Sequence, residues 1–62
     1  MYSAKAPWNM TPAEIAADIE TCRREIAACE RALSDPTTRR RSLYATHASR
    51  CRVRIGNLEA YA

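Results

Sequence analysis

Apolar side chains recur along the first half of the chain at alternating spacings of four and three residues. They are Ile15, Ile19, Cys22, Ile26, Cys29 and Leu33. This alternation keeps one side of an α-helix apolar and is typical of the seam along which two helices of a coiled coil pack. The pattern therefore predicts a helix over about 12–34.

The residues around Thr11 indicate where this helix begins. The Thr11 side chain can accept a hydrogen bond from the backbone of Glu14, and the Glu14 side chain can accept one in return, which makes a capping box. Pro12 suits the first helical position, where no backbone N–H is needed. Met10 and Ile15 occupy the two positions of a hydrophobic staple. These independent signals all place the start at residues 11–12.

A second seam with the same spacing occupies the other half of the chain. It consists of Tyr44, Ala48, Cys51, Ile55, Leu58 and Ala62. Asp35 and Pro36 separate the two seams, and an aspartate followed by a proline suits the N-cap and the first position of a helix. We therefore expect a second helix over about 36–60, which continues past Gly56 because the seam reaches Leu58.

A short connection at 34–36 folds the two seams against each other. Ile15 then lies opposite Leu58, and Cys22 lies opposite Cys51. The predicted fold class is all-α: an antiparallel, coiled-coil-like two-helix hairpin over residues 11–62, with residues 1–10 as an N-terminal arm. Because a chain of 62 residues can bury only a small core, we expect oligomerisation or a partner to complete it.

The net charge of +3 is unevenly distributed along the chain. Residues 11–35 carry six acidic and three basic side chains, whereas residues 36–62 carry six arginines and one glutamate. The two helices should therefore attract each other, and the register predicts the cross-pairs Asp18–Arg54 and Glu25–His47. At exposed positions such pairs contribute about 0–1 kcal/mol each, so we expect them to set orientation more than stability.

The three cysteines all fall on the seams, where we expect small buried apolar side chains. A disulfide between Cys22 and Cys51 is one alternative, which a reducing compartment disfavours. A metal site built around His47 and Cys51, one helical turn apart and faced by Cys22, is another. Glu25 lies nearby in this register. Zinc sites usually contain closely spaced cysteine pairs, which this sequence lacks, so neither a metal nor a cofactor is expected.

The sequence favours a non-enzymatic protein. A catalytic nucleophile needs an activating partner and a concave site, and two packed helices offer no such cleft. The sequence also lacks a glycine-rich phosphate loop and known catalytic signatures, so no catalytic residue and no small-molecule substrate are predicted. The sequence shows no signal peptide and no apolar run near the roughly 20 residues of a membrane span. We therefore expect a cytoplasmic protein that does not contact membranes.

The outer side of the second helix is less polar than a solvated face should be. Leu43, Thr46, Arg50, Val53, Asn57 and Ala60 repeat at spacings of three and four, and we call them the outer stripe. Together with Trp8 of the arm, which either folds over the open end of the hairpin or anchors a partner, the first four are the expected partner-binding residues. These residues predict a protein–protein interaction module: an adaptor, an inhibitor or an assembly subunit of the kind found in phages.

The arginines support an alternative function. Arg39, Arg40 and Arg41 are expected in the first turn of the second helix, and Arg50 follows about three turns later. Clustered positive charge on an accessible face is what phosphate binding requires. A nucleic-acid-binding hairpin that uses these four residues is therefore the alternative prediction.

Overall fold

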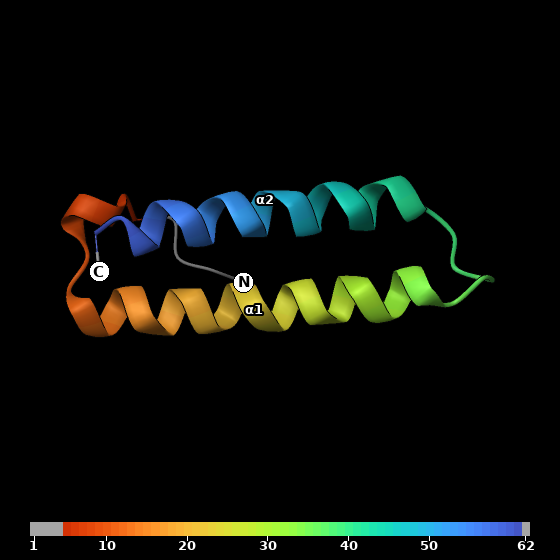
Figure 1. The fold of residues 1–62 in the computed structure, drawn as a ribbon, viewed down its shortest axis with the longest axis horizontal. Helices are drawn as coiled ribbons and strands as arrows, with labels where there is room; N and C mark the ends of the chain where they lie inside the picture. Colours follow the sequence, from red (N-terminus) through yellow and green to blue (C-terminus); the bar gives the residue numbers. More distant parts are fainter. Residues whose placement is uncertain (1–4, 62) are drawn as a thin grey trace.

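The computed structural model describes residues 5–61 of the chain. A short 3₁₀ helix, η1 (Pro7–Asn9), precedes two long helices, α1 (Pro12–Ser34) and α2 (Arg41–Glu59). As Figure 1 shows, the two long helices run antiparallel and side by side. Together they form a rod that measures 40 × 16 × 15 Å. Residues 5–61 contain no strand. The predicted all-α, two-helix hairpin is therefore confirmed.

The N-terminus of α1 has the capping box that the sequence predicts. The backbone N–H of Glu14 donates to Thr11 Oγ1 at 3.2 Å, and that of Thr11 donates to Glu14 Oε1 at 2.9 Å. Met10 and Ile15 are both buried in one cluster, so the hydrophobic staple is also present. The Lys5 ammonium, 2.6 Å from Glu14 Oε2, joins the arm to this cap.

We expect this cap to make stability depend on pH in the acid range. The hydrogen bond from Lys5, together with those from Thr11, lowers the pKa of Glu14 from 4.5 to about 2. A lowered folded-state pKa means that the stabilising effect is complete above about 4.5 and is lost as the pH falls towards 2. The difference in Tm between the wild type and Glu14→Gln should therefore shrink over this interval. Glu20→Gln, which removes no capping bond, is the control, and a constant difference for Glu14→Gln from pH 7 to 2 would contradict the assignment.

The start of the second helix differs from the prediction. Asp35 and Pro36 do not begin a helix; α2 begins only at Arg41. Asp35 Oδ1 instead accepts hydrogen bonds from the Thr37 N–H at 2.9 Å and from its hydroxyl at 2.8 Å. An aspartate side chain that bonds two residues ahead stabilises a turn, so residues 35–40 form the connection.

This connection changes the role of the arginines next to it. Arg40 adopts a left-handed conformation with φ of 57°, through which the chain enters α2. The Arg41 guanidinium donates to the backbone carbonyls of Leu33 and Asp35 at the end of α1. Terminal carbonyls of a helix lack intrahelical donors, so Arg41 supplies the bonds that α1 cannot make itself. Arg39 and Arg40 thus precede α2 rather than forming its first turn.

The core confirms the predicted register. Ile15 and Leu58 pack with Met10 in one cluster at the open end of the hairpin. Cys22 and Cys51 are both fully buried further along the hairpin. α2 continues past Gly56, so that Leu58 is reached within the helix. The core is nevertheless built largely from cysteine and alanine side chains.

The predicted cross-pair between Asp18 and Arg54 is present, but it is buried rather than exposed. Arg54 Nη2 lies 2.8 Å from Asp18 Oδ2, and the Asp18 side chain is only 2% exposed. The same Nη2 donates to the Lys5 carbonyl at 2.8 Å and contacts Met10 Sδ at 3.6 Å. The expectation of an exposed pair was wrong because the N-terminal arm lies over this part of the hairpin.

Candidate functional site

All six residues of the outer stripe are exposed; five lie on α2, and Ala60 directly follows its last residue. Leu43 is 60% exposed and Val53 is 63% exposed, and ten residues of helix place them about 15 Å apart. Single exposed apolar residues are ordinary, but two on one helix face of so small a domain define a candidate contact surface. The structure thus places the predicted partner-binding residues of α2 where a partner can reach them.

A hollow of about 340 Å³ lies beside the outer stripe, near the connection between the helices. It is lined by Cys29, Arg40, Leu43, Tyr44 and His47. Tyr44, expected on the inner seam opposite Cys29, lies beside that residue but is 39% exposed. The sequence did not predict this hollow. Arg40 lines it because α2 begins at Arg41 rather than near residue 36, which leaves Arg40 in the connection.

The arm both folds over the hairpin and exposes its aromatic residue. The Trp8 ring lies 6.5 Å from the Tyr61 ring at an angle of 55°, and Figure 1 shows η1 beside the end of α2. Trp8 nevertheless remains 70% exposed. It therefore stays available for contact, as the sequence interpretation allowed. Tyr2, which could contribute to the same end, lies outside the described residues.

The four arginines of the alternative interpretation are all exposed, but one of them is already engaged within the chain. Arg39 and Arg40 are exposed in the connection, and Arg50 is exposed on α2 about 15 Å further along the helix. Arg41 is held against the end of α1 by its two carbonyl bonds. Its guanidinium therefore has fewer donors left for a phosphate than the sequence suggests.

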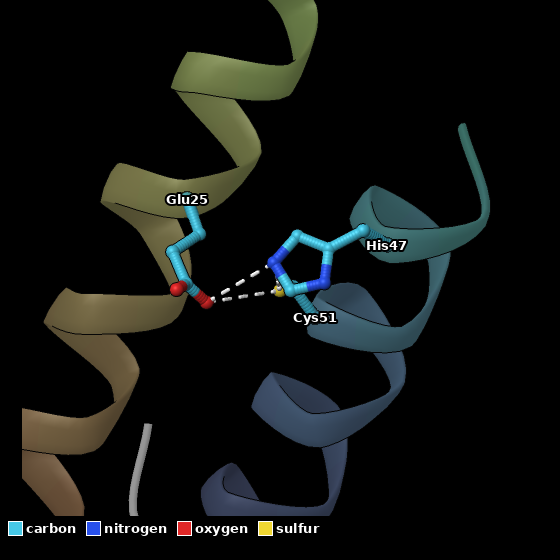
Figure 2. Close-up of side chains that lie close together, drawn as sticks. All are labelled: Glu25, His47 and Cys51. Carbon is cyan, nitrogen blue, oxygen red and sulfur yellow. Dashed lines mark hydrogen bonds and ion pairs between the residues drawn. The ribbon is translucent and has the colours of Figure 1, made fainter. Parts of the chain in front are cut away.

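Three side chains that can bind metals meet between the helices. Figure 2 shows Glu25 of α1 pointing towards His47 and Cys51 of α2. Glu25 Oε2 lies 3.3 Å from His47 Nε2 and 3.6 Å from Cys51 Sγ, and the sulfur lies 3.7 Å from the same imidazole nitrogen. The predicted pair Glu25–His47 is thus present, and Cys51 joins it.

The chemistry of the thiols follows from their burial. All three cysteines are free and buried. Burial first, and then the neighbouring Cys22 and Glu25, raises the pKa of Cys51 to about 11, and burial also raises the pKa of Cys22. The thiolate is the reactive form of cysteine, so these two thiols are held in their unreactive form at neutral pH.

Comparison of the chain with protein-family models, with curated proteins and with solved structures finds no match to any of them. Within residues 5–61, neither helix combines the length and the apolar content needed to cross a membrane. Interpretation of the site therefore rests on its geometry.

Proposed function

We propose that this chain is a small, non-enzymatic protein–protein interaction module that assembles through the outer stripe of α2, with a second copy of itself as the occupant. The observation that carries the proposal is the exposure of Leu43 and Val53 on one face of a hairpin with a small core. The alternative adaptor and inhibitor roles are the same module with a different protein on this face.

The balance of buried and exposed side chains supports assembly. Within residues 5–61, five large hydrophobic residues are exposed, whereas only three buried apolar side chains are larger than cysteine: Met10, Ile15 and Leu58. Chains of this size rarely gain more than about 3–5 kcal/mol from one core. A standard interface buries about 800 Å² per partner, which is roughly a fifth of the 4485 Å² surface. A face along the hairpin can supply that area.

The face that contains the outer stripe is suited to a second copy. The Asp18–Arg54 and Glu25–His47 pairs mark one flank of the hairpin. On that flank, Arg50 lies one helical turn before Arg54, and Leu43 lies one helical turn before His47. On α1, residues 17 and 28 of the same flank are exposed alanines. Small side chains allow close approach, so the larger stripe residues of one copy can pack against them in another.

Charge supports the same arrangement. The segment 11–35, which includes α1, carries three more acidic than basic side chains, and the segment 36–62, which includes α2, carries five more basic than acidic ones. A two-fold dimer in which each α2 packs on the partner copy's α1 brings opposite charges together. Packing α2 against α2 would instead bring like charges together, at a cost.

We expect Leu43→Glu combined with Val53→Glu to weaken self-association by at least about 100-fold, because each glutamate places a charge in an apolar contact. Sedimentation velocity at micromolar concentrations should give a dimer for the wild type and a monomer for the variant. Circular dichroism should remain helical, because neither residue belongs to the inner seam. Ala45→Glu combined with Ser49→Glu adds the same charge at exposed positions outside the stripe, and should leave the dimer intact.

Two outcomes would refute self-association through this face. One is a wild type that stays monomeric throughout the micromolar range, and the other is a Leu43/Val53 double variant with unchanged mass. Nucleic acid is the rival ligand, and a triple alanine variant of Arg39, Arg40 and Arg50 tests it. If duplex DNA or RNA binds, removing three phosphate contacts should lower the slope of log K against log salt by up to about 3. Such a result, together with unchanged self-association of the Leu43→Glu, Val53→Glu variant, would replace the present proposal with nucleic-acid binding.

A further inference from the structure

In the Glu25–His47–Cys51 cluster, the contact between the carboxylate and the imidazole is longer than a strong charged hydrogen bond. A charged imidazole and a carboxylate usually approach to about 2.7–2.9 Å, but here the two atoms are 3.3 Å apart. The contacts of the sulfur, at 3.6 and 3.7 Å, are ordinary for hydrogen bonds of this larger atom. The three atoms nevertheless all lie within 4.8 Å of one another, on two different helices.

These separations match the edges of a metal coordination tetrahedron. Zinc bonds of about 2.3 Å to sulfur, about 2.0–2.1 Å to nitrogen and about 2.0–2.2 Å to oxygen imply edges of about 3.3–3.5 Å between nitrogen and oxygen. The same bonds imply edges of about 3.5–3.7 Å between sulfur and either of the other atoms. The observed 3.3, 3.6 and 3.7 Å follow the same order. We propose that Glu25, His47 and Cys51 form a binding site for Zn²⁺ that joins α1 to α2.

The donor set selects the class of ion. Sulfur, imidazole nitrogen and carboxylate oxygen together suit zinc, whereas magnesium and calcium favour sites made entirely of oxygen. The His47 side chain is 43% exposed and lines the hollow described above, which gives the ion a route from solvent. Water from the hollow completes the fourth position.

The binding step exchanges a proton for the ion. Zn²⁺ replaces the thiol proton of Cys51, which passes to the buffer, while Glu25 binds as a carboxylate and His47 through Nε2 with its proton on Nδ1. The sulfur–zinc bond forms as the sulfur–hydrogen bond breaks, and no oxidation occurs. Because the site contains a single thiolate ligand, we expect micromolar affinity rather than that of zinc sites with several thiolates.

The sequence did not predict this site because it lacks the usual signal. Only His47 and Cys51 are close along the chain, and Glu25 is separated from them by the connection. The hairpin register brings the three residues near one another, and their side-chain conformations bring the three ligand atoms together. We expected no metal because the sequence lacks closely spaced cysteine pairs. The distances between the three ligand atoms instead favour a metal site.

Titration of Zn²⁺ into the full chain, metal-free and under a thiol reductant, tests the site by calorimetry. We expect one ion per chain, and a rise in Tm of about 10–20 °C when free Zn²⁺ exceeds the Kd about 100-fold. Co²⁺ used as a spectroscopic probe should show the intense visible bands of tetrahedral coordination and a near-ultraviolet thiolate charge-transfer band. Both signals should persist in the Leu43→Glu, Val53→Glu variant, since the site lies within one chain and does not depend on dimerisation.

Single substitutions identify the ligands. Glu25→Gln, His47→Gln and Cys51→Ala should each weaken Zn²⁺ binding at least tenfold to 100-fold, since even outer partners of a metal site have effects of that size. Cys29→Ala removes another buried cysteine but no ligand, and should bind as the wild type does. Glu25→Gln and His47→Gln change partly exposed side chains, so they keep the test valid if Cys51→Ala misfolds. Unchanged affinity in these two folded variants, loss of binding in Cys29→Ala, or no saturable binding by the wild type would each overturn the proposal.

Discussion

Replacing Arg54 with methionine should destabilise the hairpin by about 3–5 kcal/mol, as breaking a buried ion pair typically does. The Asp18 side chain is 2% exposed and receives two bonds from the guanidinium, at 2.8 and 3.2 Å. Methionine keeps the apolar stem but leaves the carboxylate in the interior without this partner. At about 0.05–0.15 kcal/mol per residue, a chain of 62 residues has a total stability of about 3–9 kcal/mol. The substitution should therefore remove between about a third and all of the stability of the hairpin.

Urea unfolding followed by circular dichroism measures this effect. Arg52→Met is the matched control, because Arg52 pairs with Glu30 at 3.5 Å with both side chains more than half exposed. Exposed pairs contribute about 0–1 kcal/mol. Combining Arg54→Met with Asp18→Leu should recover much of the lost stability, because it removes the buried charge as well. Equal losses for Arg54→Met and Arg52→Met would show that the Asp18 pair is effectively solvated.

Arg54 also explains how the arm is held. Its Nη2 reaches the carbonyl of Lys5 at 2.8 Å, so one guanidinium connects α2, α1 and the arm. Lys5 in turn pairs with Glu14 at the start of α1. Loss of Arg54 should therefore loosen the arm along with the helices, and the fluorescence of Trp8 reports on it.

The parts of the fold that depend on local chemistry were predictable from the sequence. The capping box at Thr11 and Glu14 involves residues three apart, and α1 begins where that box places it. The register followed from two seams and a short connection, which was enough to pair Ile15 with Leu58. It also placed Asp18 near Arg54, because opposite charges fell on the same flank.

The parts that depend on distant backbone were not predictable in the same way. The start of α2 at Arg41 requires the carbonyls of Leu33 and Asp35, which are within reach only once the hairpin has closed. The burial of Asp18 similarly depends on the path of the arm, for which the sequence offered two alternatives. Asp35 is an exception, because its bonds from Thr37 are local: an aspartate suits both a helix cap and a turn, and the turn formed.

The same distinction, between local features and features that depend on both helices, applies to the candidate sites. The outer stripe is a property of one helix, so its period was visible in the sequence and its exposure follows from the fold. The Glu25–His47–Cys51 cluster is a property of two helices. The register put its members near one another, but only the side-chain conformations bring three ligand atoms to metal-binding distances.

Replacing Leu58 with alanine should cost about 2–5 kcal/mol, the range for leucine-to-alanine changes in a core. Leu58 is fully buried against Met10 and Ile15, and it lies in the last turn of α2, just after Gly56. Urea unfolding gives the loss, and Glu59→Ala, an exposed neighbour in the same turn, should change stability by no more than about 0.5 kcal/mol. Because Met10 joins the arm to this cluster, Trp8 fluorescence should change at lower urea than helicity does. A loss below about 1 kcal/mol would mean that the glycine lets the last turn of α2 unwind in solution, and Arg54 alone would then close the open end of the hairpin.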